Sequence, residues 1–256
     1  MNVQPYRDQS VHRPPLPGGL QLAFAESAAD VRAAQQLRYA IFAGEMGARL
    51  HNRIPGLDHD AFDAHCHHLL VREALTGQVV GCTRILTGDS APQAGGFYSQ
   101  GEFDLGSILS LPGRFAEIGR TCVHRDYRNG ATISALWSGI ASLVAAHGID
   151  YLIGCASIPL GQDGMQAQAI YAGLAERYLS APELRVRPKT PLPRRDGIAR
   201  ADYSLPPLLK AYLRVGARIC GEPCLDEDFR VADVFILLET RQLERRYARH
   251  FLDRAA

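Results

Sequence analysis

Several features that would define a class of protein are scarce or absent in this sequence. No apolar run approaches the roughly 20 residues of a membrane-spanning helix, and residues 1–20 are polar and proline-rich, without a signal-peptide core. The 28 basic and 27 acidic residues leave a net charge of +1, which argues against a dedicated nucleic-acid-binding protein. No internal repeat is visible. We therefore expect a soluble, cytoplasmic protein with no nucleic-acid partner.

Cysteine is also sparse, with six residues dispersed along the chain. Without an export signal, they are expected to be free thiols. Hydrophobic residues make up 46% of the 256 residues, enough to bury a real core. The sequence is therefore neither disordered nor fibrous.

Composition divides the chain into an arm and a domain. Residues 1–19 end in a stretch rich in proline and glycine, which predicts a flexible N-terminal arm. Residues 20–256 are expected to form a single domain. Within it, residues 185–206 form a basic, proline-rich loop, and residues 240–254 are expected to form a charged helix.

Strand-like and helix-like segments alternate through the domain, which favours an α/β fold with a mixed sheet. Thr76-Gly77 predicts a hairpin turn, and Ser27 with Asp30 predicts a capping box at the start of a helix. Strands are expected at residues 20–25, 68–73, 78–86, 151–156 and 232–238 and around Glu117, and helices at residues 27–46, 131–147, 165–179 and 207–217.

The most informative stretch is residues 115–130. It predicts a buried strand with Glu117, then a basic turn with one glycine, then a helix. Backbone N–H groups and arginines in such a turn can hold an anion, so a phosphate-bearing donor beside a general base is one natural use. The residues we assign to binding this donor are Cys122, Val123, Arg125, Arg128, Asn129 and Gly130.

Glu117 lies between apolar neighbours, where a carboxylate is costly unless it is paired. Arg84 and Arg120 are available partners. One interpretation is a structural ion pair, and the other is a general base that accepts, through water, the proton of an incoming ammonium group. We assign Glu117, Arg84 and Arg120 to the catalytic group and leave both interpretations open.

Three residues at helical spacing suggest an acceptor site. Arg38, Phe42 and Glu45 occur at i, i+4 and i+7, on one face of the predicted helix. Arg38 could hold the carboxylate of an amino acid and Glu45 an amine. The alternative is that Arg38 and Glu45 fix the helix to its neighbours.

Residues 58–68 are rich in Asp, His and Cys but lack the second ligand pair of a tetrahedral zinc site, so we expect no metal. We assign Asp60 and Asp63 to acceptor binding or to organising this loop. Cys122 is not expected to be a nucleophile, because no neighbouring base is evident, and direct attack on the donor is simpler.

Taken together, several segments resemble the GNAT superfamily of N-acyltransferases. Within it the sequence is most similar to the branch of L-ornithine N-acyltransferases, with the acyl-homoserine-lactone synthases as more distant relatives. The segments are residues 38–45, 60–63, 66–71, 81–86, the strand with Glu117 and residues 221–233.

The resemblance implies a GNAT-type fold, with a mixed, splayed central sheet flanked by helices. It implies transfer of a fatty acyl group, typically 3-hydroxyacyl, from acyl-carrier protein to the α-amine of L-ornithine, with no cofactor beyond the donor's phosphopantetheine. A backbone N–H group between Thr121 and Val123 would stabilise the oxyanion. Arg84 resembles an arginine beside the acceptor in the lactone synthases. The single glycine of the donor turn favours a carrier protein over CoA.

Two alternatives stay open. One is an acyl-homoserine-lactone or other N-acyl amino acid synthase, against which residues 221–233 favour the ornithine branch. The other is a non-catalytic lipid- or carrier-binding module. The basic amphipathic pattern of residues 240–254 is compatible with peripheral binding to an anionic membrane surface, or with packing on the domain.

Overall fold

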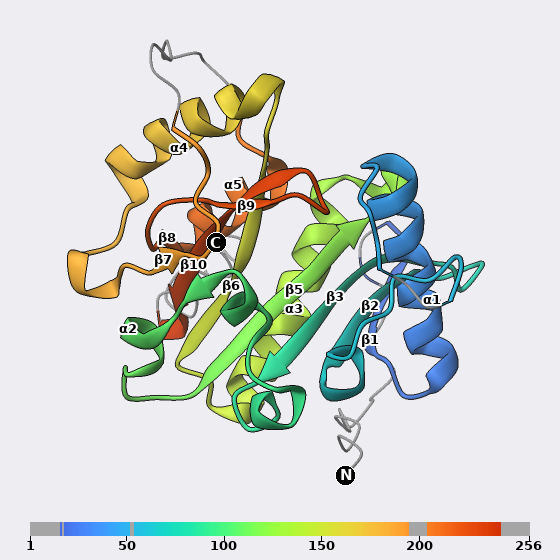
Figure 1. Cartoon of the computed structure of the whole chain (residues 1–256). Coiled ribbons are helices and arrows are strands. Elements are labelled where there is room, and N and C mark those ends of the chain that lie inside the picture. The colour runs from blue at the N-terminus through green and yellow to red at the C-terminus, as the bar shows by residue number, and fades with distance from the viewer. Residues whose placement is uncertain (1–15, 17, 52–53, 195–203, 242–256) are drawn as a thin grey trace, which may run out of the picture. The chain divides into compact units, whose positions relative to one another are not determined.

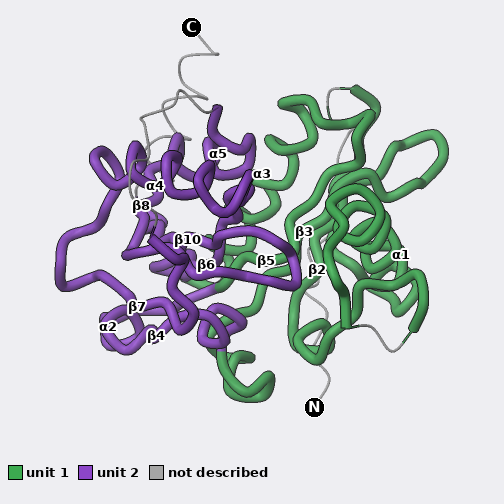
Figure 2. The backbone as a smooth tube through the Cα atoms, turned by 45° about the horizontal axis from the view of Figure 1, so that its top comes forward, with its two compact units in different colours: residues 1–96, 117–148 green, residues 97–116, 149–256 purple. Residues whose placement is uncertain are grey.

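The computed structural model describes Leu16 and residues 18–51, 54–194 and 204–241. Its contacts divide the chain into two compact units (Figure 2). Unit 1 comprises residues 1–96 and 117–148, and unit 2 comprises residues 97–116 and 149–256. Most of the predicted arm, residues 195–203 of the basic loop and nearly all of the predicted C-terminal helix lie outside the described residues.

The described part of unit 1 contains a sheet with the strand order β1-β2-β3-β5 (Figure 1). The strands are β1 (Leu20–Phe24), β2 (His67–Glu73), β3 (Val79–Thr87) and β5 (Phe115–Val123), which enters unit 1 at Glu117. β2 pairs antiparallel with both β1 and β3, and the predicted hairpin joins β2 to β3. β3 and β5 are antiparallel as well, because Val80 contacts His124 whereas Thr83, further along β3, contacts Thr121, earlier in the sequence than His124.

The first helix of unit 1 begins at the predicted capping box. Ser27 Oγ accepts a hydrogen bond from Asp30 N at 3.2 Å, and Asp30 Oδ2 accepts one from Ser27 N at 3.0 Å. The helix α1 (Ala28–Tyr39) continues as the π-helix η1 (Ala40–Glu45), because Met46 N donates to Ile41 O. The predicted helix therefore changes its hydrogen-bond pattern before its expected end. The shorter 3₁₀ segments of unit 1 are η2 (Asp63–His65), η3 (Ala91–Ala94) and η5 (Arg125–Tyr127).

The helix α3 (Gly130–His147) packs directly on this sheet. A Cβ on Gly139 would lie 2.5 Å from a Leu69 methyl carbon, so the close approach requires glycine. Gly81 of β3 faces α3, whereas Arg84, three residues on, faces the side of α1. By length and composition α3 could cross a membrane, but it packs against β1–β3 as a core helix does.

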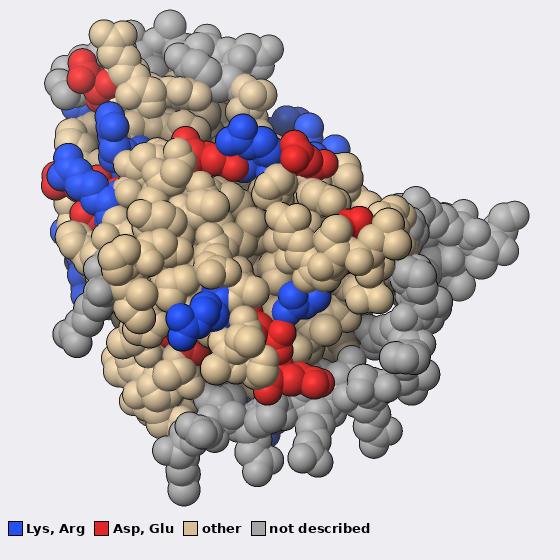
Figure 3. Space-filling view, turned by 90° about the vertical axis from the view of Figure 1, so that its right-hand side faces the viewer, with Lys and Arg blue, Asp and Glu red and all other residues tan. Residues whose placement is uncertain are grey.

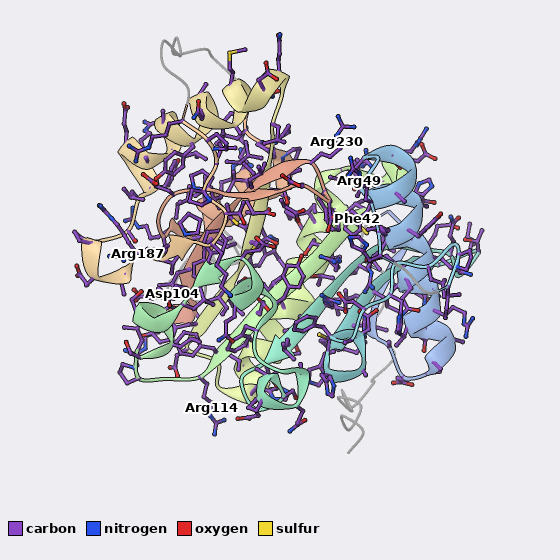
Figure 4. All side chains as sticks on the ribbon, viewed as in Figure 1. Phe42, Arg49, Asp104, Arg114, Arg187 and Arg230 are labelled. Carbon is purple, nitrogen blue, oxygen red and sulfur yellow. The ribbon has the colours of Figure 1, made fainter. Side chains whose placement is uncertain are left out.

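Unit 2 is centred on β10 (Val231–Glu239), which pairs antiparallel with β6 (Tyr151–Pro159), β8 (Arg218–Ile219) and β9 (Cys224–Asp226). In a small second sheet, β4 (Phe103–Asp104) pairs with β7 (Arg187–Pro188), and Asp104 lies opposite Arg187 (Figure 4). The helical segments of unit 2 are α2 (Gly106–Leu109), α4 (Met165–Tyr178), α5 (Pro207–Val215), η4 (Tyr98–Gly101), η6 (Gln162–Gly164) and η7 (Pro182–Leu184).

The surface agrees with the near-zero net charge. On the face shown in Figure 3, basic and acidic side chains form small mixed groups separated by uncharged surface. All six cysteines are free thiols, as the sequence predicted, and five of them are buried.

Candidate active site

The predicted catalytic carboxylate and its candidate partner lie on one face of the sheet in unit 1. Glu117 of β5 is 4% exposed, and its charge acts on the nearby Cys66 thiol. Two residues further along β5, a Cβ on Gly119 would lie 3.7 Å from Arg84 Nε of β3. Since residues at i and i+2 of a strand share a face, Glu117 and Arg84 face the same side.

Arg84 is held by two carboxylates from the loop and 3₁₀ segment before β2. Its Nη1 donates to Asp60 Oδ1 at 2.5 Å and to Asp63 Oδ1 at 2.9 Å, and its guanidinium lies over the Phe62 ring. Burial alone would lower the pKa of Arg84, but Asp60 and Asp63 raise it above its ordinary value. Arg84 is therefore a fixed, buried cation.

Arg38 is bound more completely. Its Nε donates to Asp58 Oδ2 at 2.8 Å, and its two terminal nitrogens donate to the oxygens of Asp63 at 2.9 and 2.8 Å. Nη2 also donates to the Asp58 carbonyl, and the residue is 1% exposed. A substrate carboxylate would have to displace these partners. The structure thus favours the second interpretation of Arg38, in which it fixes α1 to the acidic loop.

The two assigned aspartates differ in availability. Asp63 accepts four hydrogen bonds, from Gln35, twice from Arg38 and from Arg84. Burial would raise the pKa of Asp63, but the two arginines hold it well below its usual range. The Asp60 side chain is 25% exposed, whereas its Oδ2 atom is buried, accepts no hydrogen bond and lies 3.7 Å from Arg120 Nη2. Asp60 is therefore the aspartate with an oxygen to offer to a ligand.

Arg120, within β5, lies next to this cluster and has an unusual backbone conformation. Its φ of 50° is left-handed, which costs a non-glycine residue about 1–3 kcal/mol and persists only where the surroundings enforce it. Its Nε lies 3.3 Å from Asp58 Oδ2, and its Nη2 lies 3.7 Å from Asp60 Oδ2. Three arginines and the acidic loop thus form one network beside Glu117.

Glu45 does not join the acceptor residues. Its Oε2 lies 2.5 Å from Arg128 Nη2, and its Oε1 lies 3.6 Å from Arg125 Nε, so it contacts the predicted donor turn. The shared helix face predicted for Arg38 and Glu45 is interrupted where α1 becomes η1. Phe42, labelled in Figure 4, is a buried residue of η1.

The donor turn runs from the end of β5 through η5 to α3. Arg128 Nε donates to Val123 O at 3.0 Å, which fixes this guanidinium on the turn. Asn129 Oδ1 accepts from the N–H groups of Ala131 and Thr132, so the side chain caps α3, which begins at Gly130. Because the cap occupies two helix N–H groups, the arginines are the more accessible anion donors of the turn.

Cys122 is a poor nucleophile in this environment. Burial, and then the neighbouring Cys82 thiol at 3.6 Å, raise its pKa well above the ordinary value. This agrees with direct attack on the donor.

Sequence reasoning missed Asp58 and Gln35 as members of the network. Both are buried, Asp58 bridging Arg38 and Arg120 and Gln35 binding Asp63. The available signal was position, since Asp58 precedes Asp60 by two residues and Gln35 precedes Arg38 by three.

A second acidic group in unit 2 was also missed. The carboxylates of Glu102, Asp226 and Asp233 lie within 4.8 Å of one another, a spacing that could hold a metal ion. Burial, then the charge of Asp233, raise the pKa of Glu102 to about 8, so protonation lowers the charge of the group. Glu102 lies more than 100 residues before the two aspartates, so no local metal-binding motif marks this group in the sequence.

The chain matches known acyltransferases in sequence and fold. Residues 37–138 match the family model described as an acetyltransferase (GNAT) domain. An L-ornithine N(alpha)-acyltransferase of Rhizobium meliloti (strain 1021) is 36% identical over 91% of this chain and 84% of its own length. One of Brucella abortus (strain 2308) is 34% identical over 91% and 89%.

A solved acyl-homoserine lactone synthase, BjaI, described as CoA-dependent, superposes with a TM-score of 0.56 at 16% identity, covering 90% of this chain and 89% of its own. At that identity the match shows the fold alone. The predicted GNAT-type mixed sheet flanked by helices is confirmed, and the protein is an acyltransferase. Within that class, the chain belongs to the family of L-ornithine N(alpha)-acyltransferases.

Proposed function

We propose that this protein transfers a fatty acyl group, typically 3-hydroxyacyl, from acyl-carrier protein to the α-amine of L-ornithine, giving lyso-ornithine lipid. The observation behind the acceptor is the alignment, over 91% of the chain, with relatives named L-ornithine N(alpha)-acyltransferase. The chemistry requires no metal or organic cofactor beyond the phosphopantetheine of the donor.

Glu117 is the general base of this proposal. An amino acid arrives with a protonated α-amine, which must lose a proton before it can attack a thioester. Glu117, on the strand that leads into the donor turn, takes that proton through water. The neutral amine attacks the thioester carbonyl, and a backbone N–H group between Thr121 and Val123 stabilises the oxyanion. As the C–S bond breaks, the nitrogen loses its second proton to form the amide, and the leaving thiolate takes up a proton to give the free thiol.

The arginine and aspartate network positions the reactants. Arg38, Asp58 and Asp63 are saturated by one another and act as positioning residues. Asp60, whose side chain is partly exposed and whose buried Oδ2 accepts no hydrogen bond, binds an ammonium group of the acceptor, and Arg84 fixes Asp60. Arg120 supports the same aspartate from β5.

The donor and the location of the enzyme are parts of the same proposal. The basic residues Arg185, Arg187, Lys189 and Arg194 belong to a segment suited to docking the acidic surface of a carrier protein. The amphiphilic product must enter a bilayer, so the enzyme works in the cytoplasm and visits an anionic membrane surface peripherally.

Thiol release from 3-hydroxyacyl-carrier protein, with mass spectrometry of the product, tests the proposal. Purified protein should release thiol only with an amine acceptor and should prefer L-ornithine over lysine and other amino acids. Preferential use of S-adenosylmethionine would instead indicate a lactone synthase. Donor binding without thiol release under any condition would contradict an enzymatic role.

A further inference from the structure

Glu45 occupies an unexpected position for a carboxylate, at the end of η1 and in contact with a turn that is assigned to an anionic donor. Its two oxygens face Arg128 and Arg125, and its side chain is 21% exposed. The hydrogen bond from Arg128, followed by the charges of both arginines, holds the pKa of Glu45 below its usual value in spite of partial burial. Glu45 therefore stays charged at neutral pH.

The contact has two physical effects. Arg128 donates hydrogen bonds to Val123 O and to Glu45 Oε2, so these two contacts orient its guanidinium before a donor binds. At the same time, the negative charge of Glu45 cancels much of the attraction that the two arginines exert on an anion. Asp126 adds another negative charge to the turn, but its side chain is 73% exposed and lies 3.6 Å from His124 Nδ1.

The two possible donors differ most in charge. A phosphopantetheine arm on a carrier protein has one phosphodiester, with a single negative charge. CoA has a pyrophosphate and a 3′-phosphate, together about four negative charges at neutral pH. A fixed carboxylate beside the phosphate-binding arginines penalises each added negative charge, so it penalises CoA most.

We propose that Glu45 is a specificity-determining residue that biases the enzyme against CoA thioesters and toward the singly charged phosphopantetheine arm. The inference rests on the proposed assignment of the donor to this turn. It assigns Glu45 to donor selection, a role different from the acceptor binding expected from its sequence position.

Direct binding tests this role without an acceptor. Glu45→Gln preserves the shape and removes the charge, and calorimetry compares CoA with 4′-phosphopantetheine, which has about two negative charges. One unit charge about 7 Å away in water changes affinity about threefold, so Glu45→Gln should favour CoA over 4′-phosphopantetheine by about three- to tenfold at low salt. The gain should shrink as salt rises.

Two further variants make the test specific. Asp89→Asn removes an exposed carboxylate just after the C-terminal end of β3, at the end of the sheet opposite the donor turn, and should leave the CoA preference unchanged. Arg128→Gln should weaken both ligands, CoA more strongly. If the affinity of CoA relative to 4′-phosphopantetheine is the same in Glu45→Gln as in the parent, or if Glu45→Gln weakens both ligands equally, the proposal is overturned. Unaltered binding of both ligands by Arg128→Gln would also overturn it.

A kinetic arm separates this inference from the proposed function. In Glu45→Gln, the ratio of kcat/KM for acyl-carrier protein to that for the matching acyl-CoA should fall by a similar factor. If the parent protein acylates no ornithine, the proposed acceptor is wrong, and the binding ratios still decide the role of Glu45.

Discussion

Asp63→Asn should destabilise unit 1 far more than Asp60→Asn, although both changes remove one carboxylate charge from the same network. Asp63 accepts four hydrogen bonds, three of them from Arg38 and Arg84, which are 1% and 3% exposed. An asparagine would turn an N–H group toward at least one of these donors. The two buried cations would then lose a shared counter-charge.

The magnitude follows from burial. Removing one partner of a buried ion pair costs about 3–5 kcal/mol, and Arg38 and Arg84 keep Asp58 and Asp60, so we expect about 3 kcal/mol for Asp63→Asn. In a chain of this size that corresponds to a fall in Tm of about 6–12 °C. Asp60→Asn should cost about 1 kcal/mol, because the Asp60 side chain is 25% exposed and Arg84 keeps its bond to Asp63.

The single tryptophan makes the assay local. Trp137 lies buried on α3 in unit 1, so its fluorescence during urea or thermal unfolding reports on this unit. Because Asp63 has a lowered pKa in the folded state, its contribution is present above its unfolded value and is lost as the pH falls through the folded value. The gap between parent and Asp63→Asn should therefore narrow below about pH 4. Equal losses in Asp63→Asn and Asp60→Asn at pH 7 would refute the reasoning.

Three other predictions test separate parts of the molecule. Glu117→Gln should lower kcat by about 10²–10⁴-fold without changing Tm greatly, and near-normal turnover at neutral pH would leave only a structural role. At the left-handed Arg120, Arg120→Gly should be more stable than Arg120→Ala by about 1 kcal/mol, because glycine adopts this φ freely; equal melting temperatures would show that the backbone relaxes. Burial raises the pKa of Glu102 to about 8, so the contribution of its protonated carboxyl to stability is present below the pKa of the unfolded chain and is lost as the pH rises to about 8. At pH 9, Glu102→Gln should therefore be more stable than the parent by on the order of 1–3 kcal/mol. A stability difference between the two proteins that stays constant from pH 4 to pH 9 would contradict a buried, protonated carboxyl.

The sequence by itself determined the local structure and the class of protein. The capping box at Ser27, the hairpin at Thr76-Gly77 and the strand, turn and helix around Glu117 all depend on neighbouring residues, and all are present. The ordered set of segments from residue 38 to residue 233 pointed to the GNAT acyltransferases, and the family comparison agrees. Such signals are readable because short-range hydrogen bonding and periodicity act within a few residues.

Only the tertiary structure decided how the charges are paired. Arg38 could have faced a substrate, but the fold brings to it Asp58 and Asp63, which lie 20 and 25 residues later in the sequence. Because all three side chains are buried, their charges must be paired. Helical spacing grouped Glu45 with Arg38, yet Glu45 binds Arg128, which lies 83 residues later in the sequence. Two features of the fold accompany this contact: α1 continues as a π-helix that ends at Glu45, and β5, which leads to Arg128, lies beside β3. Long-range ion pairs depend on which surfaces the packed sheet brings together, and spacing along one segment does not contain that information.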